Sequence, residues 1–478
     1  MRTERNLSYA VLAEQTGMSL SYLNEIEKGK KFPKEDKIEL LANALQTSVE
    51  ELTSAELKNN LAPVGDLLRS NFLSELPLEL FGIDLQKVVE IIADAPLKVG
   101  AFISTLVELS RNYALREENF YFGALRAYLE LNNNYFEDIE ELAAKFIREH
   151  RLSGNYTLPV SRLQAILQKK YGYTIVEDGL KDYPNLRSIR SVYQPRNRHL
   201  LLNSQLSSRQ RAFQLAKELG FHYLGLKERA YTSSLLRVHN FDEALNHFKA
   251  GYFAAALLIN REAFLKDIRQ FFGFPAWNSG FFVELMDKYQ ATPEMLFQRI
   301  TNLAPRYFGL QKLFLLRMIH NPHTGEYELD KEMHLERRHH PQGSGLGEHY
   351  CRRWISLTLL QDMEELNNKN ERAEVLIGAQ RSKYFGTEDE YVCFTIARRP
   401  AFFPQRNISV TIGFLVDKEM KAKIKWWNDP LIPRRIVNQT CERCTITDCK
   451  ERAAPPVIAE QREQRQLIQD DLQRLMGS

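Results

Sequence analysis

The sequence predicts a multidomain α+β protein, and three observations lead to this fold class. The chain has 478 residues, more than one hydrophobic core usually serves, so we expect several domains. Residues 1–150 carry apolar side chains at helical spacing, whereas many segments after residue 310 alternate apolar and polar residues as strands do. Three of the five cysteines fall within nine positions near the C-terminus. We place the domains at 1–58, 59–150, 151–308 and 309–478.

The composition is that of an ordinary soluble globular protein, with 44% apolar and 26% charged residues. The net charge of +3 is too small to indicate nucleic-acid binding by itself, so any basic patch must be local. The chain has no run of 18 apolar residues, and its first residues contain no apolar signal segment. We therefore expect a cytoplasmic protein without a membrane partner.

The cysteine loop contains Cys441, Cys444 and Cys449. The C-x2-C spacing lets two thiolates reach one metal from a tight turn, and in a reducing compartment such a cluster indicates a metal or redox site rather than disulfides. Zinc and iron–sulfur clusters usually take four ligands, so one more is needed, from Cys351 or Cys393. We favour Cys351. The spacing favours iron–sulfur over zinc, and three unliganded thiols are the remaining alternative.

The first sixty residues predict three short helices, at 7–16, 19–27 and 35–45. Gly17 breaks the first helix, and Ser19 is placed to cap the second. Two short helices joined by a glycine turn form a helix-turn-helix unit. The side chains expected to face inward are Leu7, Val11, Leu12, Leu20, Leu23, Ile26, Ile38, Leu41 and Leu45.

The motif Leu12-Ala13-x3-Gly17-x-Ser19-x2-Tyr22-Leu23-x2-Ile26-Glu27-x-Gly29, followed by Leu41-Ala42-x2-Leu45, resembles the Xre/Cro family of bacterial repressors. The resemblance implies that the second helix enters the major groove of double-stranded DNA. Tyr9 is a departure, because the family usually has Gln there. The candidate DNA contacts are Ser19, Ser21, Tyr22, Asn24, Lys28, Lys30 and Lys31, with Lys34 beside them. The alternative for the lysines is a solvated face.

Residues 59–150 predict a helical arm that links the DNA reader to the rest of the chain. The expected helices are 65–75, 84–93, 96–112, 116–132 and 135–150. Their leucine and aromatic residues are more often core than a cofactor pocket. We expect a homodimer, and this arm is a candidate for its interface.

Residues 150–265 combine expected strands at 172–178 and 190–202 with helices at 208–224 and 242–259. The two helices, Ser208 to Leu224 and the one containing Asn246 to Leu258, resemble the ImmA/IrrE zinc metallopeptidase family. The family's first helix normally reads His-Glu-Leu-Gly-His, in which two histidines bind zinc and the glutamate activates water. The resemblance implies a zincin-like α+β core.

The zinc ligands of that family are replaced in this chain. The three ligand positions hold Lys217, Phe221 and Lys249, and only the catalytic Glu218 remains. Ammonium groups and a phenyl ring cannot coordinate zinc, and His222 lies one residue late, about 100° around the helix. We therefore expect a non-enzymatic fold kept as scaffold or ligand pocket. A shifted site that uses His222 and His247 is the alternative.

The rest of the chain predicts a helical extension and then a small α+β sensor domain. The expected helices are 279–289, 293–303, 306–318 and 457–475, and the expected strands are 311–319, 326–336, 351–361, 372–380, 391–399 and 407–416. The stretch Ala291-Thr-Pro-Glu-x2-Phe297-x-Arg299 resembles the segment that follows the peptidase core in related regulators. Arg398 and Arg399 are candidates to hold phosphates, with an inert basic pair as the alternative.

Together with Cys-x-Arg-Cys-x4-Cys-x2-Arg-Ala-x-Pro-Pro at 441–456 and Cys351-x2-Trp354, these features resemble the short-chain fatty acyl regulators of propionate and acetate metabolism. The resemblance implies acyl-CoA binding in the C-terminal half, by residues that no motif identifies. It also implies a 4Fe–4S cluster on Cys351, Cys441, Cys444 and Cys449. Cys393 is then a buried thiol.

The function that we expect is a homodimeric transcription factor that responds to short-chain acyl-CoA, to redox state, or to both. Two half-sites about 34 Å apart would be read by two helix-turn-helix domains, and a shift of that spacing would weaken binding. One alternative is an active metallopeptidase that cleaves a repressor. The other is a zinc-stapled DNA-binding protein without a sensing role.

Overall fold

The computed structural model describes residues 2, 5, 7–27, 31, 33–49, 117–152, 157–234, 238–335, 347–369, 371, 373–400 and 406–476. The chain divides into two compact units, Met1–Arg116 and Glu117–Ser478. None of the described helices is long and apolar enough to cross a membrane. The helices predicted at 65–75, 84–93 and 96–112 lie outside the described residues, as do Lys28 and Lys30.

The first unit contains the three predicted short helices, α1 (Tyr9–Thr16), α2 (Leu20–Glu27) and α3 (Glu35–Ala44). Gly17 ends α1 with φ +65°, and Ser19 Oγ accepts the Tyr22 N–H at 3.2 Å, as a helix cap does. Their common core is Leu12, Met18, Leu23, Leu41 and Leu45.

Two apolar side chains of this unit do not lie where the helical pattern placed them. Leu20 is 54% exposed and Val11 is 40% exposed, so the prediction that both face inward is wrong. Leu20 is the first residue of α2, and Met18, just before the cap, is buried in the core instead.

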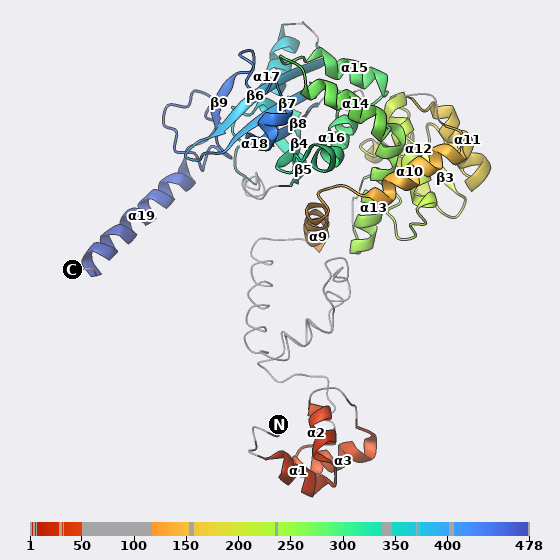
Figure 1. The fold of residues 1–478 in the computed structure, drawn as a ribbon, viewed down its shortest axis with the longest axis vertical. Coiled ribbons are helices and arrows are strands. Elements are labelled where there is room, and N and C mark those ends of the chain that lie inside the picture. The colour runs from red at the N-terminus through yellow and green to blue at the C-terminus, as the bar shows by residue number, and fades with distance from the viewer. Residues whose placement is uncertain are drawn as a thin grey trace. The chain divides into compact units, whose positions relative to one another are not determined.

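The second unit begins with three helices and a small sheet (Figure 1). The helices are α9 (Glu117–Leu131), α10 (Glu137–Glu149) and α11 (Val160–Tyr171). The strands are β1 (Thr174–Val176), β2 (Ser191–Gln194) and β3 (His199–Leu202), and a 3-10 turn, η2 (Pro184–Leu186), precedes β2. Central β3 pairs in parallel with β1 and antiparallel with β2. Of these elements, α11 and η2 were not predicted.

Two long helices, α12 (Ser208–Tyr223) and α13 (Phe241–Leu258), form the centre of the metallopeptidase-like region. Ser207 and Gln210 make a reciprocal capping box that starts α12 where the sequence predicted. The two helices approach closely at Gly220, where a Cβ atom would lie 3.1 Å from the Ala250 carbonyl oxygen. A side chain at residue 220 would therefore force the helices apart.

Three further helices lead to a six-stranded sheet. They are α14 (Arg261–Phe272), α15 (Gly280–Lys288) and α16 (Pro293–Phe308). The strands are β4 (Leu313–Asn321), β5 (Glu326–His334), β6 (Val375–Tyr384), β7 (Glu390–Arg398), β8 (Asn407–Leu415) and β9 (Arg434–Val437). Their order is β5-β4-β8-β7-β6-β9, antiparallel except for the β6–β9 pair.

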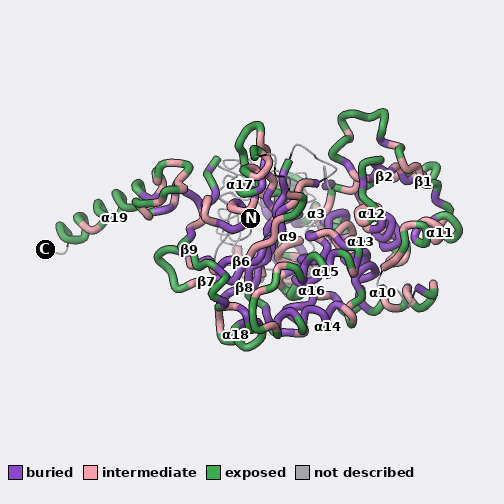
Figure 2. Tube along the Cα trace, turned by 90° about the horizontal axis from the view of Figure 1, so that it is seen from above, coloured by how far each residue is buried: buried purple, intermediate pink, exposed green. Residues whose placement is uncertain are grey.

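Both faces of this sheet are covered, which is why β7 and β8 are buried along almost their whole length (Figure 2). On β7, Phe394 and Ile396 belong to the main core with the α14–α16 helices. Tyr391 and Cys393 alternate with them and pack on the other face with α17 (Ile355–Asn368). The main core runs from Leu129 in α9 to Ile432, beyond β8, so the metallopeptidase-like region and the sheet share one core.

Two predicted elements are wrong. The helix expected at 306–318 ends at Phe308, Gly309 follows with φ +71°, and the apolar run after it forms β4. The strand expected at 351–361 is instead the start of α17, in which Leu357, Leu360 and Met363 recur at helical spacing on the buried side. Three elements were not predicted: α14, α18 (Lys418–Lys423) and β9. The last helix, α19 (Val457–Met476), follows the prediction.

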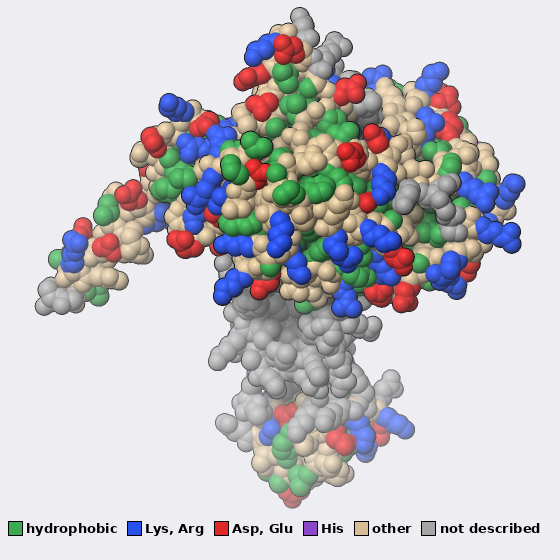
Figure 3. Space-filling model, turned by 45° about the horizontal axis from the view of Figure 1, so that its top comes forward, with side chains coloured by type: hydrophobic (Ala, Val, Ile, Leu, Met, Phe, Trp, Pro, Cys, Tyr) green, Lys and Arg blue, Asp and Glu red, His purple; other side chains and the backbone are tan. Residues whose placement is uncertain are grey.

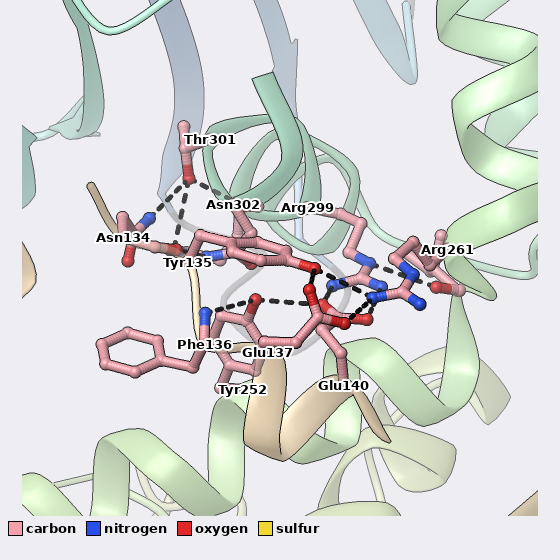
Figure 4. Close-up of polar contacts among 12 residues, drawn as sticks. Asn134, Tyr135, Phe136, Glu137, Glu140, Tyr252, Arg261, Arg299, Thr301 and Asn302 are labelled. Carbon is pink, nitrogen blue, oxygen red and sulfur yellow. Dashed lines mark hydrogen bonds and ion pairs between the residues drawn. The ribbon is translucent and has the colours of Figure 1, made fainter. Parts of the chain in front are cut away.

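A buried ion pair ties α10 to α16 (Figure 4). Arg299, at the end of the stretch singled out in the sequence, is fully buried and donates to both carboxylate oxygens of Glu140. The Tyr252 hydroxyl from α13 donates to the same carboxylate at 2.9 Å, and Arg299 Nε donates to the Ile259 carbonyl at 3.1 Å. Because every partner is satisfied, these charges stabilise one packing of three helices.

Acidic and basic side chains are interspersed on the face drawn in Figure 3. This distribution agrees with the small net charge of +3. A local concentration of positive charge occurs inside the second unit instead.

Candidate functional site

A cavity of about 460 Å³ lies in the second unit, beside the helices that hold zinc in the metallopeptidase family. Its walls come from α9, α12, α13, α16, β4, β5 and β7 and from the loops before β2 and after α12. Its cationic residues are Arg190, Lys217, Arg317, Lys331 and Arg398, and its carboxylates are Glu294 and Asp330. The apolar part includes Leu125, Phe213, Ala244, Phe248, Ala255 and Met295. The cavity therefore joins a cationic region to an apolar one.

Two of the cations are paired with carboxylates. Arg317 forms an ion pair with Asp330, and Arg398 donates to both oxygens of Glu294 at 2.9 and 3.1 Å. Arg398 and Arg317 together hold the pKa of Glu294 at about 2 although its burial opposes this. The Nε atom of Arg398 is buried without a hydrogen-bond partner in the described structure.

Three further cations have no carboxylate partner of their own. The Arg190 guanidinium makes no hydrogen bond or ion pair with any described residue, and burial with the nearby Arg317 lowers its pKa. Lys331 donates to Gln298 at 2.9 Å, and burial lowers its pKa to about 8. With Lys217, these groups give the cavity a positive excess suited to an anionic ligand.

Lys217 points at a histidine where the metallopeptidase family binds its metal. Its Nζ lies 2.7 Å from His247 Nε2 and 3.3 Å from the Ser233 carbonyl oxygen. Burial lowers the pKa of Lys217 to about 7. Burial and the charge of Lys217 lower the pKa of His247 well below its usual value, so His247 is the acceptor of this hydrogen bond.

The remaining catalytic residue of the metallopeptidase pattern is engaged elsewhere. Glu218 forms a bidentate pair with Arg229 at 2.8 and 2.9 Å and accepts the Tyr173 hydroxyl at 3.0 Å. His222 lies 2.7 Å from the same hydroxyl oxygen, so it has a different partner from His247. Glu218 is thus held as a structural carboxylate, and the shifted His222–His247 site has no support in this geometry.

The other two replaced ligand positions also have structural surroundings. The Arg229 guanidinium lies 3.8 Å from the ring centroid of Phe221, which is buried. Lys249 is partly buried on α13 and does not line the cavity.

The cysteine loop is joined by backbone hydrogen bonds to the segment that contains Cys351. Cys351 N–H donates to the Gln439 carbonyl at 3.1 Å, and Cys441 N–H donates to the His349 carbonyl at 2.8 Å. Trp354 Nε1 donates to the Asn438 carbonyl at 2.9 Å. Residue 351, ninety positions upstream of Cys441, is therefore held beside the cysteine loop.

Arg452 organises the loop itself. Its guanidinium donates to the carbonyls of Cys441, Cys444, Ile446 and Ala454. Glu348 and Glu442 pair with Arg443 and His349 and add further links between the two segments. The loop shape thus depends on a few charged side chains around three cysteines.

The thiols have surroundings that suit a bound metal centre only in part. Asn438 N–H points at Cys351 Sγ at 3.5 Å and Ala453 N–H at Cys441 Sγ at 3.3 Å, and such bonds tune the sulfur ligands of iron–sulfur clusters. Cys449 Sγ instead lies 3.8 Å from Glu451 Oε2. Within the described ranges, no three His, Cys, Asp or Glu side chains are already arranged to hold a metal ion.

The protonated thiols of Cys351 and Cys393 are strongly favoured. Burial raises the pKa of Cys351 to about 11, with the charges of Cys441 and Cys444 adding to the shift. Cys393 is buried in β7, as expected, and burial raises its pKa to about 12. It packs with Tyr384 and Tyr391 in the same apolar cluster that contains Cys351.

The candidate DNA-contacting residues on and beside α2 differ in their exposure and in the contacts that they already make. Ser21 is exposed, whereas Tyr22 and Asn24 are half-buried. Ser19 is exposed, but its hydroxyl is used as the helix cap. Lys31 forms an ion pair with Glu25 at 2.9 Å and lies 5.8 Å from the Tyr22 ring centroid.

The sequence analysis named Lys217, His247 and Arg398, which all line the cavity, but it missed several other lining residues. Arg398 was proposed as a phosphate contact and does line the cavity, but Arg399 does not. Arg190, Arg317 and Lys331 were not singled out, and Glu294 was named only as part of the quoted stretch at 291–299. Arg190 begins one expected strand, Arg317 lies in the apolar run of another, and Lys331 lies between Asp330 and Glu332 in a third. Their basic character gains meaning only when the strands are placed together.

Comparisons with known proteins agree with two resemblances found in the sequence, the helix-turn-helix and the metallopeptidase-like region. Residues 1–52 match the helix-turn-helix family model, and residues 168–301 match the model of the IrrE N-terminal-like domain. No curated protein matches the chain. A solved Mycobacterium tuberculosis transcriptional regulator is similar over 70% of this chain and 94% of its own, with 19% identity and a TM-score of 0.47. The chain therefore joins a helix-turn-helix region, typical of DNA-binding regulators, to an IrrE-like region.

Proposed function

We propose that this regulator changes its DNA affinity in response to a short-chain acyl-CoA bound in the cavity beside Lys217. The observation that carries the proposal is the cavity's excess of positive charge next to an apolar wall. The diphosphate and ribose phosphate of CoA match Arg190, Lys331 and the buried Arg398 Nε, and arginine suits phosphate because its donors form a planar fork. The apolar residues then suit the acyl chain.

The geometry weighs against peptidase activity in the same region. Zinc needs oxygen, nitrogen or sulfur lone pairs, and the residues at its family positions are Lys217, Phe221 and Lys249. Glu218, which would have to activate water, already accepts hydrogen bonds from Arg229 and Tyr173. A ligand-binding role uses the cavity without requiring either group to react.

The cysteine segment supplies the second part of the proposal, a 4Fe–4S cluster held by Cys351, Cys441, Cys444 and Cys449. The chemistry of the donors supports this proposal, because thiols are the usual ligands of such a cluster, the four come from two segments that backbone hydrogen bonds join, and two N–H groups point at sulfur. Bound to these thiols, such a cluster supplies a redox-sensitive crosslink. This chain's residues contribute the frame: Arg452 shapes the loop, and Trp354 fixes the opposite segment.

Control of DNA binding follows from the arrangement of two DNA-binding domains. We propose that a homodimer reads two half-sites, and that ligand or cluster binding favours one spacing of the domains. Such coupling requires the ligand to bind one state more tightly than the other. A shift of a few ångströms from about 34 Å weakens specific binding without any change in α2.

The test of the acyl-CoA part measures ligand and DNA binding on the same full-length protein. Target DNA is first selected from random fragments, and its affinity is measured with and without propionyl-CoA. Arg190→Ala and Arg398→Ala should weaken propionyl-CoA binding at least tenfold each, since each removes a charged hydrogen-bond donor. Arg196→Ala, at an exposed position outside the cavity, is the matched control. Unchanged affinity in both cavity variants overturns the proposed site.

The test of the cluster part is an iron and acid-labile sulfide assay on anaerobically purified protein. Cys351→Ser and Cys444→Ser should both lose iron, whereas Cys393→Ser should retain it. If the parent protein contains stoichiometric zinc and no sulfide, the four cysteines hold a structural zinc ion and the proposed iron–sulfur sensor is wrong. If Cys351→Ser retains iron and Cys393→Ser loses it, the fourth ligand is Cys393 and the proposed assignment to Cys351 is wrong.

A further inference from the structure

Lys217 combines three features that are required neither for DNA binding nor for electrostatic attraction of the CoA phosphates. It lines the cavity, it is buried among α12 and α13, and its Nζ is hydrogen-bonded to His247 rather than to a carboxylate. The cavity's ion pairs, Arg317–Asp330 and Arg398–Glu294, show that carboxylates are available in this region. Lys217 is instead paired with a neutral base.

This pairing makes the amine nucleophilic at physiological pH. Because burial lowers the pKa of Lys217 to about 7, about half of it carries a lone pair at pH 7. An exposed lysine with a pKa near 10.4 has less than roughly a thousandth of its amine in that form. Desolvated lysines of this kind serve as nucleophiles toward carbonyl carbon in many enzymes.

We propose that Lys217 is a site of acylation by the thioester bound in the cavity. The inference rests on the proposed function, since it requires a short-chain acyl-CoA there. The Lys217 nitrogen forms an amide bond with the acyl carbon, the carbon–sulfur bond breaks, and CoA leaves as the thiolate. The proton lost by nitrogen passes to His247 Nε2 and then to the leaving sulfur, so atoms and charges balance and no further reactant is needed.

Acylation would leave a lasting change in the cavity. The amide removes one positive charge and adds a short apolar chain beside Phe213 and Phe248, which also line the cavity. Since the charge excess carries the affinity for CoA phosphates, the modified protein should bind a second CoA more weakly. Because the amide bond is covalent, the lowered affinity for CoA would persist after the thioester is no longer present.

The experiment uses the full-length protein with propionyl-CoA and follows each lysine by peptide mass spectrometry. Binding is measured separately with an analogue in which a methylene group replaces the thioester sulfur, so that no acyl group can leave. We expect propionylation of Lys217 at least tenfold faster than that of Lys227, an exposed lysine on a loop. Lys217→Arg should abolish the modification at this position and leave that at Lys227 unchanged.

The outcomes separate the two proposals. Binding of the analogue without faster acylation of Lys217 overturns the inference and leaves the proposed function standing. A failure of the analogue to bind removes both. Equal acylation of Lys217 by propionyl phosphate, which lacks the CoA moiety, also overturns the inference, because the cavity would then not direct the thioester to the amine.

Discussion

Lys217 Nζ lies 2.7 Å from His247 Nε2, a contact between the two central helices of the IrrE-like region. The contact bridges α12 and α13, so an ammonium–imidazole hydrogen bond joins the helices that zinc joins elsewhere. The Lys217 side chain is positively charged only when it is protonated, whereas the zinc ion of the metallopeptidase family is always divalent.

The first prediction concerns how the stability of the second unit depends on pH. The pKa of Lys217 falls from 10.5 in the unfolded chain to about 7 in the folded one. Between these values the unfolded state binds more protons, so the free energy of unfolding should rise with pH from about 7 upward. Chemical denaturation at pH 7.0 and pH 8.5 should show a gain on the order of 1 kcal/mol.

The comparison for this prediction is Lys217→Met, which should flatten the rise over the same interval. Lys331, whose pKa is lowered to about 8, contributes in the same direction, so Lys331→Met is measured beside it. Measurements stay below pH 9 because the raised pKa values of Cys351 and Cys393 act with opposite sign above it. An equal slope in Lys217→Met and the parent protein would contradict the assignment.

The sequence predicted helices better than it predicted the cavity, for a physical reason. The periods that define α12 and α13 are local, and their caps at Ser207 and Asn240 are local too. The run after Leu313 was assigned partly to a helix because a short apolar run fits either structure until its partners are known. Pairing with β5 and β8 on both sides made it a central strand.

The cavity residues could not be predicted from local patterns. Arg190 and Arg317 are single basic residues and Arg398 is one of a pair, each next to or within a strand, and more than eighty positions separate each of the three from the next. Only the fold brings them to one cavity. The cysteine loop was easier, because three of its four proposed ligands are close in the chain and the fourth was sought among only two residues.

The second prediction concerns the buried Glu140–Arg299 pair. Arg299→Met removes the cation that forms a bidentate ion pair with the buried Glu140 carboxylate, so it should lower the free energy of unfolding by about 3–5 kcal/mol. The double variant Glu140→Leu with Arg299→Met removes both charges and should lose much less. Urea denaturation of the three proteins decides the matter. A double variant as unstable as the single one would mean that the pair does not act as a charge pair.

The third prediction concerns α2. Asn24→Ala and Tyr22→Ala should each weaken binding to selected DNA, by about 1–3 kcal/mol if the lost contact is to a base edge. Ser19→Ala should act mainly on folding, at a cost of about 1 kcal/mol, because its hydroxyl caps the helix. Fluorescence anisotropy gives the affinities, and thermal unfolding gives the stability. Asn43→Ala, at an exposed position on α3, serves as the control. If both α2 variants bind DNA with unaltered affinity, α2 does not make the DNA contacts and another surface of the protein does.

The last prediction concerns Arg452, which belongs to the cysteine motif at 441–456 but is not itself a metal ligand. Its guanidinium holds four carbonyls of the cysteine loop, two of them at Cys441 and Cys444, so the loop cannot keep its shape without it. If the loop binds a cluster, Arg452→Ala should lose most of its iron although all four thiols remain. Arg465→Ala, on the exposed face of α19, should retain iron as the parent protein does. Arg452→Lys should recover only part of the iron, because a single ammonium lacks the fork that reaches several carbonyls. Full iron content in Arg452→Ala would show that the metal centre, rather than this side chain, sets the shape of the loop.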